Sequence, residues 1–157
     1  HVAEKHGWAR FVSMQDHLNL IYREEEREML PLCRAEKIGV IPYSPLASGR
    51  LTRDGSSEST FRSETDQIQK MKYDASAEMD RQIVARVAEL AQKHGAPRTH
   101  IALAWLLQKK PVTAPIVGAT KIAHLEEAIG ALSVKLTQEE VAYLEEPYVP
   151  HRVVGHQ

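Results

Sequence analysis

Short apolar segments alternate with longer helical patterns along this chain, and the alternation restricts the fold more than any other feature of the sequence. Residues Ala9 to Gln15, Gly39 to Tyr43 and Thr113 to Val117 are short, apolar and followed by polar or glycine-containing turns, as buried strands are. A helical pattern follows each segment. Repeated strand-then-helix units predict a parallel sheet covered by helices, which is an α/β fold.

The expected helices carry start and stop signals. The segment 24–37 is acidic at its start and basic at its end, as the helix dipole favours, although Pro31 predicts a kink or a later start. Ser76 can cap a helix that runs to His94 and stops at Gly95. Three more helices are expected, beginning at Thr99, at Thr120 or Lys121 and running through Leu132, and at Thr137 with Glu140 as its capping-box partner.

Two further stretches bear on the architecture. The start of the chain resembles the tail of a helix stopped by Gly7, and the segment from Gly49 to about Ala75 is a long polar stretch expected to be a functional lid or partly disordered. Three strands cannot close a barrel, and a complete eightfold barrel needs about 250 residues. The sheet is therefore either open and complete in itself or the last part of a barrel.

Composition favours a folded domain that binds a small molecule or another protein. The 157 residues are 43% hydrophobic, and 20 basic residues nearly balance 21 acidic ones, which argues against nucleic acid or an anionic membrane as partner. No apolar run approaches the roughly 18 to 20 residues of a membrane span, and no signal-peptide pattern opens the chain. The single cysteine, Cys33, fits a reducing compartment, so a cytoplasmic location is expected. No spacing typical of metal ligands stands out.

Two motifs carry most of the information in this sequence. One is IGVIPYSPLASG at 38–49; the other is APIVGATK at 114–121, followed by HLEEA at 124–128. With these motifs the chain resembles the aldo-keto reductase family. The similarity extends over nearly the whole chain, and the closing PYVPH at 147–151 resembles bacterial and fungal members related to potassium-channel beta subunits. In that family these segments are the sixth to eighth strands of a (β/α)8 TIM barrel and the loops after them. The resemblance implies that residues 1–157 are the C-terminal NADP-binding portion of such a barrel, incomplete as given, with 147–157 as a tail and substrate loop.

The loop Ser44 to Gly49 and the turn Gly118 to Lys121 suggest the same chemistry without the resemblance. Small residues after a strand let backbone amides approach a pyrophosphate closely, and a helix start with free N–H groups and a lysine favours a phosphate. Ordinary turn punctuation or a surface lysine explains either motif when it stands alone. Their pairing favours a dinucleotide site.

The resemblance assigns residues on the nicotinamide side of this site. Gln15 matches the residue that hydrogen-bonds the carboxamide, and Tyr43 matches the aromatic residue that stacks on the nicotinamide ring. Arg53 and Arg62 lie where the family places cationic contacts to the phosphates. The alternatives are a core tyrosine at a strand end for Tyr43 and solvated surface arginines for the other two.

On the adenosine side, the resemblance places Thr120, Lys121 and His124 near the ribose 2′-phosphate and Glu127 near the adenine. His124 replaces a more usual Arg or Gln, and Ala128 replaces a common Asn, so adenine contacts can be fewer and the preference for NADP over NAD weaker. The full set of predicted cofactor-binding residues is Gln15, Tyr43, Ser44, Pro45, Leu46, Ser48, Gly49, Arg53, Arg62, Gly118, Ala119, Thr120, Lys121, His124 and Glu127.

No catalytic residue is predicted in this chain. The catalytic Asp, Tyr, Lys and His of the family lie on its first four strands, and none of those segments is present in this sequence. His17, just beyond Gln15, is the most tempting candidate for chemistry, but packing or capping is its expected role. The remaining tyrosines and histidines lack the family's context.

The leading hypothesis is therefore an NADP-dependent oxidoreductase that reduces aldehydes or ketones to alcohols, with this chain supplying the cofactor-binding half and inactive alone. The alternative is a non-catalytic truncated remnant or a regulatory nucleotide-binding module. A protein-interaction domain on the helices at 76–110 rests only on their amphipathic pattern. The particular carbonyl substrate and the oligomeric state stay open.

Overall fold

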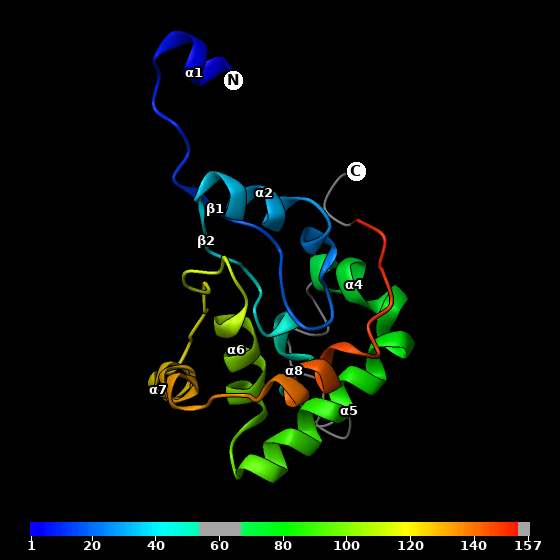
Figure 1. The fold of residues 1–157 in the computed structure, drawn as a ribbon. Helices are drawn as coiled ribbons and strands as arrows, with labels where there is room; N and C mark the ends of the chain where they lie inside the picture. The colour runs from blue at the N-terminus through cyan, green and yellow to red at the C-terminus, as the bar shows by residue number, and fades with distance from the viewer. Residues whose placement is uncertain (54–66, 154–157) are drawn as a thin grey trace.

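The computed structural model describes residues 1–53 and 67–153, and it has the mixed helix and strand content expected of an α/β protein (Figure 1). Strands β1 (Ser13–Met14) and β2 (Gly39–Val40) pair in parallel, with Ser13 opposite Gly39 and Met14 opposite Val40. The pairing continues as an isolated parallel bridge between His17 and Tyr43. The first two predicted strands are thus parallel neighbours, as expected.

The third predicted strand lies on the other side of β2. Val112 forms a parallel bridge with Val40, the Thr113 amide donates to the Val40 carbonyl at 2.8 Å, and the Ile116 amide donates to the Pro42 carbonyl at 2.8 Å. The order is therefore β1, β2, then the segment after Val112, all parallel. Regular strand is shorter than predicted, because the two outer segments each have one unpaired edge and prolines remove ladder donors.

The predicted helix at 24–37 is divided in two. A 3₁₀ turn, η1 (Glu24–Glu26), precedes α2 (Met29–Glu36), so the true start is late, as Pro31 suggested. Pro31 lies in the first turn of α2, where its missing N–H removes no intrahelical bond. Helix α5 (Ala77–His94) matches its prediction and ends at Gly95 with φ 59°, the left-handed conformation that glycine adopts without strain.

The two predicted N-caps have different outcomes. Ser76 is the N-cap residue of α5, as predicted, but its hydroxyl makes no cap hydrogen bond and instead donates to Asp80 Oδ2 at 2.6 Å. Helix α6 (Arg98–Gln108) begins after Pro97, so Thr99 is a buried residue within the helix rather than its cap. Proline before the helix has an extended ψ of 151° that already sets the entry of the chain, so no threonine cap is needed.

The later helices follow their signals closely. Helix α7 (Ile122–Gly130) begins after Lys121 and continues as the 3₁₀ turn η4 (Ala131–Ser133). Helix α8 (Gln138–Glu145) has the predicted capping box, in which the Glu140 amide donates to Thr137 Oγ1 and the Thr137 amide donates to the Glu140 carboxylate. The short first helix α1 (Val2–His6) ends at Gly7, as expected, and stands apart from the rest of the molecule (Figure 1).

The long polar segment is less irregular than predicted. Its start forms a 3₁₀ turn, η2 (Ala47–Gly49), and its end forms α4 (Gln67–Tyr73) and the 3₁₀ turn η3 (Asp74–Ser76). The loop prediction is therefore wrong for 67–76. Tyr73 explains the order there, because its side chain is fully buried and holds α4 against the segment that follows β1.

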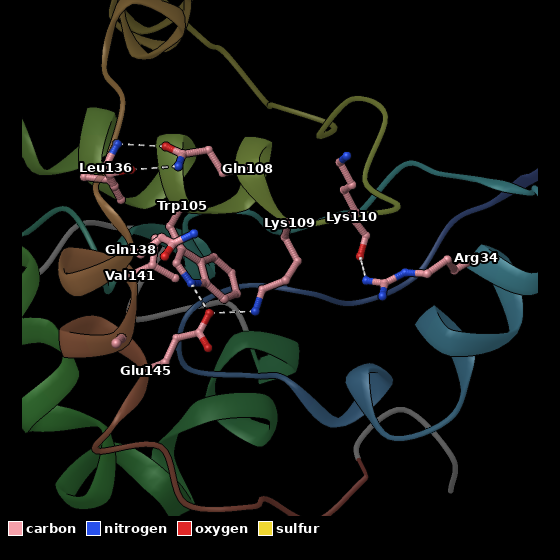
Figure 2. Close-up of a pocket in the computed structure, with 10 residues that line it drawn as sticks. Arg34, Trp105, Gln108, Lys109, Lys110, Leu136, Gln138, Val141 and Glu145 are labelled. Atoms are coloured by element: carbon pink, nitrogen blue, oxygen red, sulfur yellow. Dashed lines mark hydrogen bonds and ion pairs between the residues drawn. The ribbon is translucent and has the colours of Figure 1, made fainter.

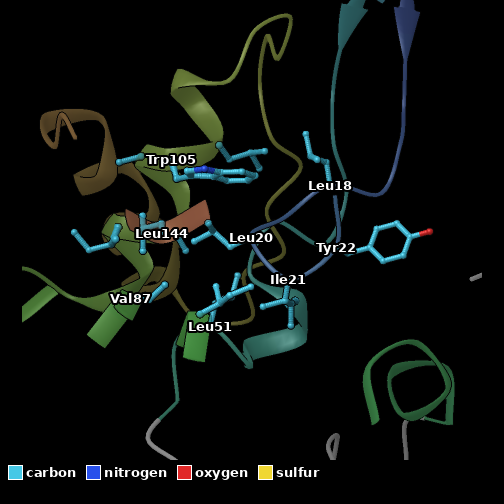
Figure 3. Close-up of a cluster of buried hydrophobic side chains, with 14 of the residues drawn as sticks. Leu18, Leu20, Ile21, Tyr22, Leu51, Val87, Trp105 and Leu144 are labelled. Carbon is cyan, nitrogen blue, oxygen red and sulfur yellow. The ribbon is translucent and has the colours of Figure 1, made fainter. Parts of the chain in front are cut away.

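The hydrophobic core lies between the segment after β1 and the helices α5, α6 and α8. Leu18, Leu20 and Ile21 supply one side of it, and Val87, Trp105 and Leu144 supply the helical side (Figure 3). Helix α6 is buried on most of its faces, as its continuous apolar sequence predicted. This packing fixes the loops that follow the strands on a helical base.

Large apolar side chains are exposed in two parts of the chain. Phe11 is 87% exposed, and Trp8 and Val12, which also precede β1, are exposed as well. Ile122, the first residue of α7, is 78% exposed, and Leu132 in η4 is 66% exposed. Exposed apolar side chains of this size suit surfaces on which other elements pack.

Within residues 1–53 and 67–153, no helix is both long enough and apolar enough to span a membrane. Across the same residues, no three His, Cys, Asp or Glu side chains come together as a metal site would require.

Candidate cofactor-binding site

The predicted site residues follow the carboxyl ends of the parallel segments. Gln15 comes directly after β1, the Tyr43 to Gly49 loop follows β2, and the Gly118 to Lys121 turn follows the third segment. Because the segments are parallel neighbours, both turns lie beyond the same end of the sheet, the one at which the strands have their carboxyl ends. The parallel pairing of the three segments was expected from the sequence. That the two turns belong to one dinucleotide site stays a prediction.

The loop after β2 has an unusual backbone. Ser44, Ala47 and Ser48 have φ of 53°, 49° and 56°, in the left-handed region that side chains other than glycine rarely adopt. Such conformations cost about 1–3 kcal/mol each and persist where surrounding structure fixes them. The amides of Ala47 and Gly49 donate to carbonyls within the loop, so in this conformation they do not converge on an external phosphate.

The backbone favours glycine at position 49, because its φ is 91°. The Arg53 guanidinium lies directly over it, with Nε 3.0 Å from the position of an added Cβ. The Arg53 side chain thus lies against this loop, and its contact with a cofactor phosphate, which the resemblance implies, stays a prediction. Arg62 lies outside the described residues.

Tyr43 is half-buried just after β2, and its ring is contacted by His17, earlier in the chain, and by Lys72, later in the chain. The His17 ring stacks on it at 4.9 Å between centroids and 12° between planes, and the Lys72 ammonium lies 4.6 Å from its centroid. Burial raises the pKa of the Tyr43 hydroxyl, and the Glu25 and Asp16 carboxylates raise it further. The ring is therefore a neutral, oriented plane next to Ser44.

The second turn is open to solvent. Gly118, Ala119, Thr120 and Lys121 are all exposed, and Lys121 is the N-cap residue of α7 with no side-chain hydrogen bond to the helix. His124 lies one helical turn later, with its Nδ1 3.5 Å from Thr120 Oγ1. Glu127, partly buried, follows on the same helix. An exposed lysine at a helix start, where the helix dipole is positive, suits a phosphate monoester.

Sequence reasoning missed a buried polar network beside this loop. Tyr73 Oη lies 2.7 Å from His17 Nε2 and accepts from Asn19 Nδ2 at 3.1 Å, and Asn19 Nδ2 also donates to the Ser44 carbonyl at 2.9 Å. His17 is 4% exposed, so the expected packing role holds for it. The network joins residues up to 56 positions apart, and no local pattern in the sequence marks such a contact.

Asp16 is a further buried polar residue here. It is 4% exposed, and neither of its carboxylate oxygens has a hydrogen-bond partner among the residues that the structure describes. Burial raises the pKa of this carboxyl to about 6, and the nearby Glu25 charge contributes. The backbone of Asp16 nevertheless supports the site, because its carbonyl accepts from the Tyr43 amide at 2.8 Å.

The described part of the C-terminal tail is irregular, as expected, but it is held in place. Tyr148 Oη donates to Glu24 Oε1 at 2.8 Å, and the His151 amide donates to the same oxygen at 2.7 Å. The His151 ring lies 2.8 Å from Asp80 Oδ1 in a buried ion pair, and the hydrogen bond to Asp80 raises the pKa of this histidine. The tail therefore spans from α8 to the η1 turn and the start of α5.

A separate pocket of about 560 Å³ lies between α2, α6 and α8, lined in part by Arg34, Trp105, Lys109 and Glu145 (Figure 2). Lys109 precedes the third parallel segment, so this pocket lies toward the amino ends of the segments, away from the candidate site. Glu145 Oε1 accepts from Trp105 Nε1 at 2.8 Å and from Lys109 Nζ at 2.6 Å, so these polar groups satisfy one another. Barrel enzymes place their chemistry at the carboxyl ends, and this pocket is not the candidate site.

Comparison with known families decides the relationship. The aldo/keto reductase family model matches residues 1–148. The chain belongs to the aldo/keto reductase family. The resemblance inferred from the strand and turn motifs is therefore confirmed.

Individual members of the family agree with this assignment. The chain is 46% identical to an aldo-keto reductase of Fusarium vanettenii over 99% of its own length and 41% of that protein. It is 46% identical to a putative aryl-alcohol dehydrogenase of Schizosaccharomyces pombe, over 98% of its own length and 43% of that protein. It is 45% identical to the versiconal hemiacetal acetate reductase of Aspergillus parasiticus, over 97% of its own length and 44% of that protein. The chain thus spans less than half the length of these curated relatives.

A solved aldo-keto reductase structure has the same arrangement. The thermostable aldo-keto reductase Tm1743, determined in complex with the inhibitor epalrestat, superposes with a TM-score of 0.61 at 28% sequence identity. The match covers 88% of this chain and 40% of that one. The α/β fold with an aldo-keto reductase as structural neighbour is therefore established.

Proposed function

We propose that this chain supplies strands six to eight of a (β/α)8 barrel and the NADP(H) site of an aldo-keto reductase that reduces aldehydes or ketones to alcohols. The observation that carries the proposal is the common edge at which Gln15, the Tyr43 to Gly49 loop and the Gly118 to Lys121 turn all lie. The exposed apolar side chains around Phe11 and Ile122 suit surfaces on which the rest of a barrel would pack. Residues 147–157 would then form the C-terminal tail and substrate loop.

The residues at this edge fit such a cofactor in most respects. Tyr43 offers a partly exposed ring for stacking, Gln15 an exposed amide for a carboxamide, and Lys121 an exposed ammonium at a helix start for a 2′-phosphate. The engaged amides of the Ser44 to Gly49 loop fit less well, so a pyrophosphate would depend more on Arg53 beside the loop. When bound, NADPH supplies the hydride, and the protein orients it.

In this assignment, each residue has a binding or positioning task. Tyr43 fixes the face of the nicotinamide ring, Gln15 fixes its rotation, and Lys121 selects the phosphorylated cofactor over NADH. A small carbonyl compound is the proposed substrate, with neither nucleic acid nor a membrane as partner. The buried free thiol of Cys33 suits a reducing compartment, and we place the protein in the cytoplasm.

Lys121→Ala tests the cofactor assignment. If Lys121 pairs with the 2′-phosphate, the substitution should weaken NADPH binding by about ten- to a hundredfold, since a charge-assisted contact is worth about 1.5–3 kcal/mol. NADH binding should change little, because NADH lacks that phosphate. Dissociation constants for both cofactors, measured by fluorescence titration at low and high salt, give the result, and the NADPH effect should shrink as salt screens the contact.

Lys135→Ala, another exposed lysine, is the matched control and should leave both constants unchanged. Equal weakening of NADPH and NADH by Lys121→Ala would show that Lys121 supports the turn rather than recognising the phosphate. In that case the assignment of NADP over NAD would be wrong.

A further inference from the structure

His17 forms the middle of a stack of three rings beside the candidate site. Its imidazole lies 4.1 Å from the Tyr22 ring at 17° between planes, and 4.9 Å from the Tyr43 ring at 12°. Tyr22 is fully buried, and its ring points away from the aliphatic cluster formed by Leu20 and Ile21 (Figure 3). The column Tyr22, His17, Tyr43 therefore runs from the protein interior to the half-exposed Tyr43 ring.

Hydrogen bonds fix the middle ring from its edge. Tyr73 Oη is 2.7 Å from His17 Nε2, and Tyr73 is held in turn by Asn19 Nδ2 at 3.1 Å. The His17 and Tyr73 rings also meet edge to face at 5.7 Å and 70°. Tyr73 belongs to α4, and His17 belongs to the segment after β1. The His17 ring therefore cannot rotate without breaking its hydrogen bond to Tyr73 and its stacking on Tyr22 and Tyr43.

The middle ring is uncharged. Burial lowers the pKa of His17 to about 3, and the nearby Lys72 ammonium lowers it further. A neutral imidazole keeps the column free of a buried charge, whose desolvation would otherwise have to be offset. The Lys72 ammonium lies 4.6 Å from the Tyr43 ring. Because His17 is neutral, it does not place a second positive charge against the same ring.

We propose that His17 is a positioning residue for the nicotinamide ring, because its flat ring, locked by Tyr73, sets the plane of Tyr43. The inference rests on the proposed function, since Tyr43 is the ring on which a nicotinamide would stack. It adds a determinant that lies behind the binding surface and does not itself touch the cofactor. The chemical group that it serves is a planar pyridine carboxamide, not the phosphates or the adenine.

The test compares NADPH with adenosine 2′,5′-bisphosphate, which keeps the adenosine and the 2′-phosphate but lacks the nicotinamide. His17→Leu should weaken NADPH binding by about two- to tenfold, the value of one aromatic pair. Binding of the bisphosphate should not change. Both constants are measured by calorimetric titration of the 157-residue chain, with circular dichroism to confirm that each variant is folded.

Three further variants make the result specific. His17→Phe keeps a flat ring and should restore most of the NADPH affinity. In a Tyr43→Ala background, His17→Leu should have no additional effect, because the plane that it sets is gone. Tyr73→Phe preserves the core volume, so it remains informative if His17→Leu does not fold, and it should reproduce the selective loss in smaller measure.

Equal weakening of NADPH and the bisphosphate by His17→Leu, or full additivity with Tyr43→Ala, would overturn the positioning role and leave His17 as a packing residue. Unchanged NADPH binding in a folded His17→Leu variant would overturn it as well. Failure of the unaltered chain to bind either compound is a different result, which overturns the proposed function itself.

Discussion

The polar residues Asn19 and Asp16, which follow β1, are both buried, but the free-energy cost of burial differs between them. Asn19 satisfies its side chain with the Ser44 carbonyl, Tyr73 and the Ile21 amide. Asp16, three residues earlier, has no hydrogen-bond partner for either carboxylate oxygen within residues 1–53 and 67–153. A buried carboxylate without hydrogen bonds is destabilising, and the protein responds by a pKa raised to about 6. This residue should therefore govern part of the pH dependence of stability.

Asp16→Asn should stabilise the chain above pH 6, by about 1–2 kcal/mol after allowance for partial solvation of the carboxylate. The folded-state pKa of Asp16 is about 6, against an ordinary value of 3.8, so the folded state holds its proton more tightly and stability falls as pH rises through that window. The gain should vanish toward about pH 3, where the wild-type carboxyl is mostly protonated in both states. Urea unfolding of both proteins between about pH 3 and pH 8 measures it, and a pH-independent difference would contradict this account.

At the scale of elements, local chemistry predicted some boundaries and tertiary packing set the others. The Thr137 and Glu140 capping box and the Gly95 stop need only nearby backbone, so their sequence signals suffice. Thr99 carries the same kind of signal but lies inside α6, because Pro97 already directs the chain into the helix. Helix α4 was missed since Tyr73, buried against residues far earlier in the chain, holds it in place.

The candidate site divides in the same way. Its two turns were predictable, because each follows an apolar strand pattern and the parallel pairing brings them to one edge. The ring column behind Tyr43 was not, because nothing near His17 in the sequence indicates Tyr73 as its partner. The sequence therefore predicts the residues that follow the strands, but not His17 and Tyr73, which pack behind Tyr43 and orient it.

The capping box joins two elements as well as starting one. Glu140 contacts Lys93 Nζ at 2.8 Å and His94 Nε2 at 2.9 Å, so it ties the start of α8 to the end of α5. Thr137→Ala removes the hydroxyl that accepts from the Glu140 amide and should lower the free energy of unfolding by about 1 kcal/mol. Gln92→Ala, at an exposed position of α5, is the control and should change it little. A Thr137→Ala variant as stable as wild type would show that the Glu140 ion pairs alone hold the helix start.

For the whole molecule, the surroundings of Tyr43 bear on proton transfer. Reduction of a carbonyl needs an acid with a pKa near the working pH, close to the developing alkoxide. Burial raises the pKa of Tyr43 and of Tyr73, which makes both hydroxyls weaker acids. His17 stays neutral with a pKa of about 3. None of these three groups is an effective proton donor at neutral pH. The Asp16 carboxyl has a pKa of about 6, but it is 4% exposed and so is shielded from a carbonyl compound.

The purified 157-residue chain should therefore not oxidise NADPH with an aromatic aldehyde above a no-protein control, even under conditions where it binds the cofactor. Loss of general acid assistance alone lowers a rate by about 10²–10⁴-fold. Absorbance at the NADPH band, followed from pH 5 to pH 9, measures the rate, and cofactor binding measured in the same samples separates an inactive chain from an empty one. Turnover that rises as the pH falls would mean that the chain does supply an acid. The variants Tyr43→Phe and Tyr73→Phe would then identify it, because only loss of the donating hydroxyl would abolish the rate.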